Sequence, residues 1–428
     1  MKYAILTLGC KVNQFETQAV ETMLRAHGHS PTDAGDADAV IVNTCAVTAE
    51  SGRKSRQAVR RLRAENPGAV CAVCGCFSQV EPEAAAALGA DVLFGSGDRA
   101  GFVAAVERAV AARAQAREID DPFRRTHFEP LPAGALEAHT RAYLKIEDGC
   151  DNFCAYCIIP YARGRVRSLP VAAAAQEAAR LQCEGFREIV VTGIEIASYG
   201  KDLLDGSALA DVVSAVAAAA PSARIRLGSL EPTVVTEDFC AALAAAGTVC
   251  DHFHLSLQSG CDRTLRAMRR KYDTAAFLRT AERLRAFFPG CALTADLITG
   301  FPGETEEDFA ETLAFLRRVG FAAMHVFPYS ARPGTRAAAM PGQLPRAVRE
   351  ARARAAISAA EELQRAYLDA QIGAVRAVLF ETAQPDGLWQ GHAENYCAVC
   401  APGESLHGVM KNVQITARNG KKLMGIIV

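Results

Sequence analysis

Short apolar runs alternate with longer amphipathic, charged stretches through the first quarter of the chain. Each apolar run has the length of a strand, and each charged stretch has the spacing of a helix that buries one face. Strands are predicted over 3–8, 39–42 and 69–73, and helices over 14–27, 50–65 and 82–89. An alternation of this kind favours a parallel sheet with helices on its faces. The pattern therefore predicts an α/β, doubly wound N-terminal domain over residues 1–112.

A second, longer series of the same kind begins near residue 141. Six predicted strands are each followed by an Ala/Leu/Arg-rich helical stretch, and they cover 143–147, 188–192, 224–228, 252–257, 293–299 and 323–328. Six units are too few for a closed eight-stranded barrel and favour a partial TIM-like (β/α)6 barrel over 141–370, ending in a helix near 345–370. Residues 113–140 are rich in Ala, Arg and Pro without a clear period, which predicts a linker.

The pattern changes again near residue 371. Short apolar runs are separated by the turn sequences Pro385-Asp386-Gly387, Pro402-Gly403 and Asn419-Gly420. Turn residues at such intervals are typical of short antiparallel strands. We therefore expect a small antiparallel β barrel over 371–428.

Composition narrows the class of protein. The chain has 428 residues, of which 50% are hydrophobic, and a formal net charge of −1. This charge excludes a globally basic nucleic-acid binder, although local basic clusters could still contact RNA. No run approaches the roughly twenty apolar residues that span a membrane. Fifteen cysteines without a framework of small loops indicate the reducing cytoplasm, and we expect a monomer.

Three cysteines, Cys150, Cys154 and Cys157, lie four and three residues apart. Thiolates at this spacing can bind three irons of a cubane iron-sulfur cluster and leave the fourth iron open to a ligand. The aromatic Tyr156 before the last cysteine fits the same pattern. A zinc site is the alternative, but no fourth Cys or His lies within the usual few residues. A zinc-stabilised RNA-binding protein is therefore the non-enzyme alternative.

A second set of cysteines follows the first three predicted strands. Cys10, Cys45 and Cys76 each come just past a strand, and ligands of open α/β sheets bind beyond the carboxyl ends of the strands. A second three-cysteine site is therefore expected at this edge. The alternative is that they are ordinary buried cysteines. Cys71 and Cys74 lie within the third strand and are predicted to point to opposite faces, so they cannot chelate together.

With these cysteines in place, nearly the whole chain resembles the methylthiotransferase family of radical S-adenosylmethionine enzymes. The last segment resembles the TRAM domain, an RNA-binding barrel. The motifs that carry the resemblance are Leu8-Gly-Cys10-Lys-Val-Asn13, Asn43-Thr-Cys45-Ala-Val-Thr48, Cys74-Gly-Cys76-Phe-Ser-Gln79, Lys145-Ile-Glu-Asp-Gly-Cys150, Ile159-Pro-Tyr-Ala-Arg163-Gly164, Arg167-Ser168, Leu257-Gln258-Ser259-Gly260, Gly300-Phe-Pro-Gly-Glu304, Phe327-Pro-Tyr-Ser330 and Gly391-His-Ala-Glu394-Asn395-Tyr396.

The resemblance implies two [4Fe-4S] clusters and S-adenosylmethionine. The cluster on Cys150, Cys154 and Cys157 would generate a 5'-deoxyadenosyl radical, and the second, on the strand-end cysteines, would carry the sulfur. A flavodoxin or ferredoxin is the expected electron donor. The C2–H of adenine has no acidic proton, so ordinary acid-base catalysis would fail there.

Within the family, Cys10-Lys11-Val12-Asn13 and the short tail look like the branch that acts on N6-threonylcarbamoyladenosine beside the anticodon of tRNA. Sister branches modify isopentenyladenosine in tRNA or a ribosomal-protein aspartate, and both stay open as alternatives.

Residues at the carboxyl ends of the barrel strands are expected to hold S-adenosylmethionine. Helix capping, turn formation or barrel packing is the alternative for each of them. The nine candidates are Tyr156, Thr192, Gly193, Ser229, Glu231, Gln258, Asp296, Ile298 and Gly300. His252 and His254 follow a strand pattern and are predicted to be structural.

The candidates for RNA contact are local. Arg163, Arg165 and Arg167 follow the radical motif and could meet a phosphate, and Tyr396 could stack on a base. A basic helix is a further candidate, although a charge run is often only a solvated face. It carries Arg53, Lys54, Arg56, Arg60, Arg61 and Arg63. Cys397 and Cys400 are predicted to be non-ligands.

Overall fold

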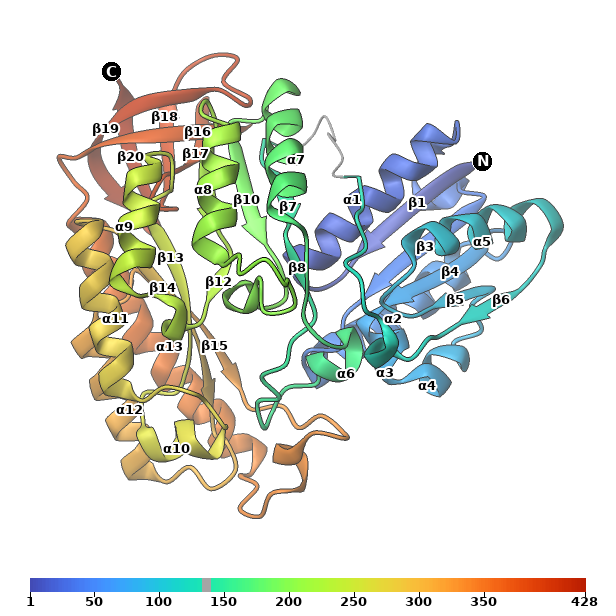
Figure 1. Cartoon of the computed structure of the whole chain (residues 1–428), viewed down its shortest axis with the longest axis horizontal. Helices are drawn as coiled ribbons and strands as arrows, with labels where there is room; N and C mark the ends of the chain where they lie inside the picture. The colour runs from blue at the N-terminus through green and yellow to red at the C-terminus, as the bar shows by residue number, and fades with distance from the viewer. Residues whose placement is uncertain (133–139) are drawn as a thin grey trace.

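The computed structural model describes residues 1–132 and 140–428, so part of the predicted linker, 133–139, lies outside the described residues. The N-terminal domain is a six-stranded parallel sheet in the order β2-β1-β3-β4-β5-β6. Figure 1 shows it in blue and cyan, beside the green strands of the next domain. Its strands are β1 (Lys2–Thr7), β2 (Ser30–Pro31), β3 (Ala39–Thr44), β4 (Val70–Gly75), β5 (Val92–Phe94) and β6 (Ala116–Glu118).

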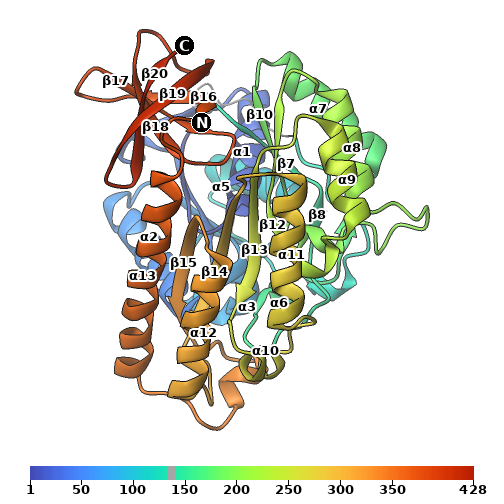
Figure 2. The ribbon, with the colours of Figure 1, turned by 90° about the vertical axis from the view of Figure 1, so that its left-hand side faces the viewer.

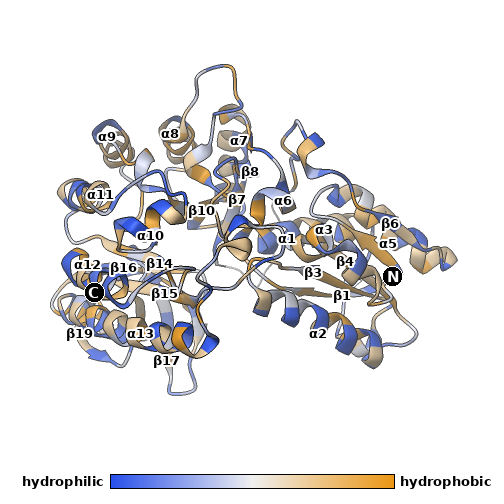
Figure 3. Cartoon of the chain, turned by 90° about the horizontal axis from the view of Figure 1, so that it is seen from below, coloured by the Kyte–Doolittle hydropathy of each residue, from blue (hydrophilic) through white to orange (hydrophobic). Residues whose placement is uncertain are grey.

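Helices cover both faces of this sheet, as predicted for a doubly wound domain. On one face, α1 (Lys11–Ala26) and α5 (Arg99–Ala112) pack with Cys74 in one core. On the other, α2 (Ala49–Glu65), α3 (Cys76–Val80) and α4 (Pro82–Ala86) pack with Cys71 in a second core. Cys71 and Cys74 thus point to opposite faces, as predicted. Figure 3 shows the apolar strands between the two helix layers.

The strand β6 corrects one predicted boundary. Residues Ala116–Glu118 pair in parallel with β5, so the sheet continues past residue 112 into the segment predicted as a linker. The segment is short and polar. Because β6 is the edge strand of the sheet, it pairs on one side only and its side chains can face solvent. An apolar pattern therefore could not reveal it.

Six βα units follow and form an open parallel barrel, as predicted. Among the described residues the strands pair in two sheets, β11-β10-β7 and β12-β13-β14-β15, with β11 and β12 separated by Gly228. The strands are β7 (Ala142–Lys145), β10 (Glu188–Thr192), β11 (Arg224–Leu227), β12 (Ser229–Leu230), β13 (His252–Gln258), β14 (Ala292–Thr299) and β15 (Ala323–Pro328). The helices are α7 (Val171–Cys183), α8 (Leu209–Ala219), α9 (Glu237–Ala246), α11 (Thr274–Phe287), α12 (Glu306–Val319) and α13 (Arg346–Asp369).

Short elements complete this domain around the radical motif. They are β8 (Glu147–Asp148), α6 (Ile159–Arg163), β9 (Arg167–Ser168) and α10 (Asp262–Ala267), and β8 pairs with β9 in an antiparallel ribbon. This ribbon holds the two ends of the cysteine loop together, because Cys150 follows β8 and α6 precedes β9.

Helix α1 joins the first two domains. Phe15 belongs to the N-terminal helix but is buried in the apolar core of the barrel, the same core that contains Leu144 of β7 and Ile189 of β10. Residues four apart on a helix share a face, so Lys11, one turn earlier, is on the side of α1 that meets the barrel. The N-terminal helix therefore brings its first turn to the barrel.

The C-terminal domain is a closed five-stranded barrel in the order β16-β17-β18-β20-β19. All pairings are antiparallel except β18 with β20, which is parallel. Figure 2 shows the barrel in red above α13. Its strands are β16 (Val375–Ala383), β17 (Leu388–Ala393), β18 (Ala398–Pro402), β19 (Met410–Asn419) and β20 (Lys422–Ile427).

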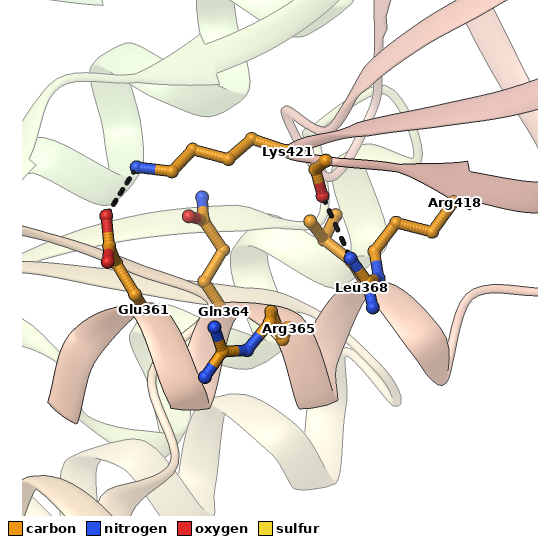
Figure 4. A pocket seen from close by; sticks show the side chains of 7 residues that line it. Glu361, Gln364, Arg365, Leu368, Arg418 and Lys421 are labelled. Carbon is orange, nitrogen blue, oxygen red and sulfur yellow. Dashed lines mark hydrogen bonds and ion pairs between the residues drawn. The ribbon is translucent and has the colours of Figure 1, made fainter. Parts of the chain in front are cut away.

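Helix α13 leads into this barrel and is tied to it by ion pairs. Lys421 Nζ lies 2.9 Å from Glu361 Oε1, and Arg418 Nε lies 2.6 Å from Asp369 Oδ1. Figure 4 shows the hollow between the helix and the β19–β20 hairpin, where the Lys421 pair is visible. No described helix, the 24-residue α13 included, is long and apolar enough to cross a membrane.

Candidate active site

The three cysteines of the radical motif lie in a loop between β8 and α6. The loop directs backbone N–H groups at sulfur: Asn152 N is 3.5 Å from Cys150 Sγ, and Ile159 N is 3.4 Å from Cys157 Sγ. Burial raises the pKa of the Cys157 thiol to about 12. Iron binds the thiolate, so binding of a cluster must release the thiol protons. The metal-sulfur bonds then compensate the cost of burying the negatively charged thiolates.

Cys154, the middle cysteine of the motif, receives a hydrogen bond from a buried arginine. Arg270 Nη1 donates to Cys154 Sγ at 3.1 Å, and Arg270 Nη2 lies 3.4 Å from Glu231 Oε1. Asn152 Nδ2 donates to Glu231 Oε2 at 3.3 Å. Glu231, one of the predicted cofactor residues, is therefore linked to the cysteine loop through two partners.

Two further buried carboxyl groups lie beside this loop, and sequence reasoning missed both. Glu147 Oε1 and Glu195 Oε1 have no hydrogen-bond partner among the described residues. Burial, followed by the nearby Glu231, raises the pKa of Glu195 to about 7, and burial raises the pKa of Glu147 well above its usual value. Unsatisfied buried acceptors are costly, so a donor is expected to complete them.

These carboxyl groups suit the charge of S-adenosylmethionine, which carries an ammonium and a sulfonium group. Glu195 is close enough to Cys150 and Cys157 to raise the pKa of both thiols. A cation bound beside the cysteines would satisfy the orphaned oxygens. The residues present therefore fit both a cluster and a cationic cofactor. The only signal for Glu195 in the sequence is its place three residues after the end of β10, which equally suits a helix-capping residue.

The predicted cofactor residues lie at the carboxyl ends of the barrel strands or nearby. Thr192 ends β10 and is buried. Ser229 Oγ is 2.9 Å from Ser256 Oγ, and Gln258, the last residue of β13, has a left-handed backbone with φ of 63°. Asp296 Oδ2 lies 3.2 Å from His254 Nε2. These positions stay candidates for cofactor contact.

Two of the predicted cofactor residues, one aromatic and one aliphatic, pack against an apolar core next to the cysteine loop. Tyr156 and Ile298 lie against one small apolar core that also contains Phe301 and Tyr329. The pKa of Tyr156 is raised well above its usual value, mainly by burial. Their clearest role is therefore to support the cysteine loop from the barrel side.

Two of the glycines have packing explanations that the sequence did not give. A Cβ on Gly300 would lie 2.4 Å from Arg349 Cγ, so this glycine lets α13 approach β14. A Cβ on Gly193 would lie 2.7 Å from Glu147 Oε2. For Gly300 this packing against Arg349 accounts for the glycine without a cofactor, and cofactor contact stays a prediction.

The strand-end cysteines of the N-terminal domain converge as predicted. Cys10 caps α1 after β1, Cys45 follows β3, and Cys76 begins α3 after β4. A Cβ on Gly9 would lie 3.1 Å from Cys45 Sγ, so the β1 and β3 ends are in contact. Each of the three thiols influences the pKa of another member of the set. The sheet order reverses between β1 and β3, which is where such folds bind ligands.

Arg163 connects this second cysteine set to the barrel domain. Its Nε lies 3.3 Å from Cys76 Sγ, its Nη2 donates to Asn13 Oδ1 at 2.8 Å, and its Nη1 pairs with Glu16. The side chain is 0% exposed. The prediction that Arg163 meets an RNA phosphate is therefore wrong, because the guanidinium is buried between the domains.

Arg163 belongs to a larger buried charge network around Glu16. Arg99 Nη2 lies 3.0 Å and Lys145 Nζ 3.2 Å from the Glu16 carboxylate, and Lys145 Nζ also lies 2.7 Å from Asp148 Oδ2. Burial alone would raise the pKa of Glu16, but Arg163, Arg99 and Lys145 outweigh it and lower that pKa. The network links α1 to the strand that leads to Cys150.

The other two arginines of the predicted basic run differ from each other. Arg167 is 4% exposed and donates to the carbonyl oxygens of Arg165 and Arg163, so the prediction of phosphate contact is wrong for it as well. Arg165 is 65% exposed and lies 3.2 Å from Asp151 Oδ1. Of the three, only Arg165 stays a candidate for RNA contact.

Tyr396 lies where the C-terminal barrel meets the radical domain. Its ring stacks with His252 and His392, at centroid distances of 5.0 and 4.9 Å, and the guanidinium groups of Arg141 and Arg226 lie over it at 5.3 and 4.7 Å. These four side chains give Tyr396 an interdomain contact, and the residue is still 38% exposed. Stacking of a base on Tyr396 therefore stays a prediction.

No three His, Cys, Asp or Glu side chains within 1–132 and 140–428 are close enough to share a single metal ion. Zinc requires its ligands at about 2.0–2.3 Å from one centre, so they must crowd together. Thiolates of a four-iron cluster bind different irons and stand further apart. The spacing within each cysteine set therefore suits a four-iron cluster better than a single zinc ion.

Gly149 offers a test of the cysteine loop. It has φ of 89°, and a Cβ there would lie 1.9 Å from the Arg165 carbonyl oxygen, so Gly149→Ala must displace the backbone next to Cys150. Gly185→Ala is the matched control, since Gly185 has φ of 96° but no atom near a Cβ. Both variants carry a strain of about 1–2 kcal/mol. We expect only Gly149→Ala to lose about half of the iron in anaerobic reconstitution. Equal iron in both variants would contradict this role of the loop.

Comparison with known proteins defines the class first. Residues 144–316 match the radical SAM superfamily, and residues 2–95 match a family described as uncharacterized protein family UPF0004. A solved radical S-adenosylmethionine methyltransferase, TsrM of Kitasatospora setae, has a similar fold over 78% of this chain and 74% of its own, with a TM-score of 0.60 and 15% identity. The chain is a radical S-adenosylmethionine enzyme.

Relatives of known family narrow this class. The chain is 35% identical to the threonylcarbamoyladenosine tRNA methylthiotransferase MtaB of Bacillus subtilis over 96% of this chain and 93% of that protein, and 36% identical to its namesake in Thermotoga maritima over 92% and 89%. It is also 31% identical to a tRNA-2-methylthio-N(6)-dimethylallyladenosine synthase of Pelotomaculum thermopropionicum over 100% and 97%. The chain belongs to the methylthiotransferase family, whose enzymes use S-adenosylmethionine and [4Fe-4S] clusters.

Proposed function

We propose that this protein converts N6-threonylcarbamoyladenosine beside the anticodon of tRNA to its 2-methylthio derivative. The supporting observation is the similarity to relatives of the two branches: four relatives named for threonylcarbamoyladenosine share 33–36% identity with this chain, and four named for dimethylallyladenosine share 31–34%. The ionic surroundings of Lys11, described below, agree with a charged substituent.

In this proposal each cysteine set holds one cluster. Cys150, Cys154 and Cys157 hold the radical cluster, and Cys10, Cys45 and Cys76 hold the second. When bound, these groups and S-adenosylmethionine supply a radical able to remove the C2 hydrogen of adenine and a methylthio group to replace it. A flavodoxin or ferredoxin is the proposed electron donor.

The chain's own residues position these groups. Glu195 and Glu147 would accept hydrogen bonds from the cationic cofactor, since each has a buried oxygen without a partner. Arg270 donates to Cys154 Sγ and fixes Glu231. Arg163 donates to Cys76 Sγ and brings positive charge to a site of three thiolates. A buried hydrogen bond to sulfur stabilises the thiolate and tunes its metal.

The proposed function is tested by nucleoside mass spectrometry of tRNA. Cells that lack the gene are expected to lose 2-methylthio-threonylcarbamoyladenosine and to accumulate the unmethylthiolated base. The wild-type gene should restore the signal and Cys154→Ala should not. An unchanged signal in the deletion strain would refute this substrate. Loss of 2-methylthio-isopentenyladenosine instead would assign the enzyme to the sister branch, and loss of methylthio-aspartate from a ribosomal protein would remove tRNA as the substrate.

A further inference from the structure

Lys11 is a cation without an ion-pair partner at the meeting point of the three domains. It is the first residue of α1, directly after Cys10, and is partly buried. Phe15 on the same helix face lies in the barrel core, so this face of α1 meets the barrel. Within the described part of the chain, the Lys11 ammonium has no salt bridge within 4 Å. An ammonium held partly out of water without an anion is unfavourable unless a ligand completes it.

The neighbours of Lys11 are charged, and the arginines among them are already paired. Arg226 Nε lies 2.8 Å and Arg141 Nε 3.0 Å from Glu188 Oε1, and Arg226 also donates to two carbonyl oxygens of the C-terminal barrel. Arg224 lies 2.6 Å from the other oxygen of Glu188. Burial, then Arg226, lower the pKa of Lys11, while Glu188 raises it. Three guanidinium groups thus converge on Glu188, and Lys11 adds a cation beside them.

One nitrogen of a buried imidazole near Lys11 also lacks a hydrogen-bond partner among the described residues. His252 is 5% exposed, its Nε2 lies 3.1 Å from Thr294 Oγ1, and its Nδ1 has no hydrogen bond among the described residues. Burial, followed by Arg226, His254 and Lys11, lowers the pKa of His252 well below its usual value, so the ring is neutral. A neutral imidazole nitrogen can bond a hydroxyl or N–H group.

A further charged neighbour of Lys11 is Asp296. It lies close enough to raise the pKa of Lys11, and it pairs with His254 Nε2 at 3.2 Å. The place between α1 and the barrel is therefore lined by ammonium, imidazole and carboxylate groups. A dimethylallyl group has no polar atom for these side chains to bind, whereas a threonylcarbamoyl group carries a carboxylate, a hydroxyl and N–H groups that they can bind.

We infer that Lys11 binds the carboxylate of the threonyl group of the substrate and so sets the choice between charged and apolar N6 substituents. This inference rests on the proposed function. Because Cys10 precedes Lys11, an anion held by Lys11 fixes the modified base beside the cysteine set proposed to carry sulfur. His252 Nδ1 is the second polar contact available to the same substituent.

The test measures binding by the full-length, anaerobically reconstituted protein to three anticodon stem-loop RNAs. The first carries N6-threonylcarbamoyladenosine, the second its methyl ester, and the third N6-dimethylallyladenosine. For the wild type we expect the free acid to bind about tenfold or more tighter than the ester, as for a charge-assisted hydrogen bond. For Lys11→Gln this ratio should fall below about threefold, and Lys11→Arg should keep most of it.

Lys2→Gln, an exposed cation on β1, is the matched control and should keep the wild-type ratio. The ratio compares two ligands on one variant, so a lower active fraction does not change it. If Lys11→Gln discriminates acid from ester as the wild type does, the role of Lys11 is overturned and the proposed function stands. If the wild type itself prefers the dimethylallyl RNA, the proposed function fails, and the role of Lys11 with it.

Discussion

In the Cys45→Ala variant, anaerobic reconstitution is expected to give about four irons per chain instead of about eight, because one of two four-iron clusters loses a ligand. The variant should still cleave S-adenosylmethionine to 5'-deoxyadenosine under dithionite, since Cys150, Cys154 and Cys157 are untouched. It should form no methylthiolated RNA, a loss of at least about a thousandfold. Iron and sulfide analysis, chromatography of the nucleoside products and RNA mass spectrometry measure the three outcomes.

Two further cysteine variants make this test specific. Cys71→Ala removes a thiol that is equally buried but points into a helix-covered core, and it should keep both clusters. Cys154→Ala should keep about four irons but lose S-adenosylmethionine cleavage altogether. About four irons in the wild type, unchanged in Cys45→Ala, would contradict the second cluster and leave a radical enzyme of another class.

The elements of the fold follow from patterns that are local in sequence. The predicted strands 188–192 and 323–328 coincide with β10 and β15, because each is an apolar run bounded by turn or helix signals. The strand predicted at 224–228 is interrupted in the structure, since β11 ends at Leu227 and β12 begins at Ser229. A sheet break of this kind depends on pairing with β13, which no single run of residues encodes.

The two cysteine sets of the candidate site could be predicted because the spacing along the chain or the order of the strands brings their members together. Cys150, Cys154 and Cys157 share one loop, and Cys10 and Cys45 follow neighbouring parallel strands, so both sets could be placed without coordinates. Arg163 could not, because its partner Glu16 lies 147 residues away. Three arginines at alternate positions after the radical motif predict phosphate contact unless the opposing carboxylate is known.

Glu195 shows a second limit of the sequence. Its carboxyl is functionally interesting because it is buried, lacks a partner for one oxygen and lies near Glu231. None of these properties is visible in a Thr-Gly-Ile-Glu run, which equally suits a turn after a strand. The same limit explains Gly300, whose small size serves packing against α13.

Glu16 is a buried carboxylate that three buried cations share, so its removal should be strongly destabilising. In Glu16→Gln, Arg163, Arg99 and Lys145 keep their charges without this counter-ion. Removing one partner from a buried ion pair costs about 3–5 kcal/mol, and here Asp148 compensates only in part, through Lys145 and Arg163. Urea unfolding of the reconstituted protein, followed by circular dichroism, should show a first transition at clearly lower denaturant.

Glu21→Gln is the control for this prediction, because it makes the same chemical change on the same helix. Glu21 pairs with Arg25 at the surface, with side-chain exposures of 16% and 52%, so its loss should cost less than about 1 kcal/mol. Glu16→Gln should also weaken the second cluster, since Arg163 Nε contacts Cys76 Sγ only while Glu16 and Asn13 hold its other nitrogens. Equal midpoints for the two variants would show that the network does not fix α1 to the barrel. If Glu16→Gln unfolds early but keeps its full iron content, Arg163 stabilises the domain contact without supporting the cluster.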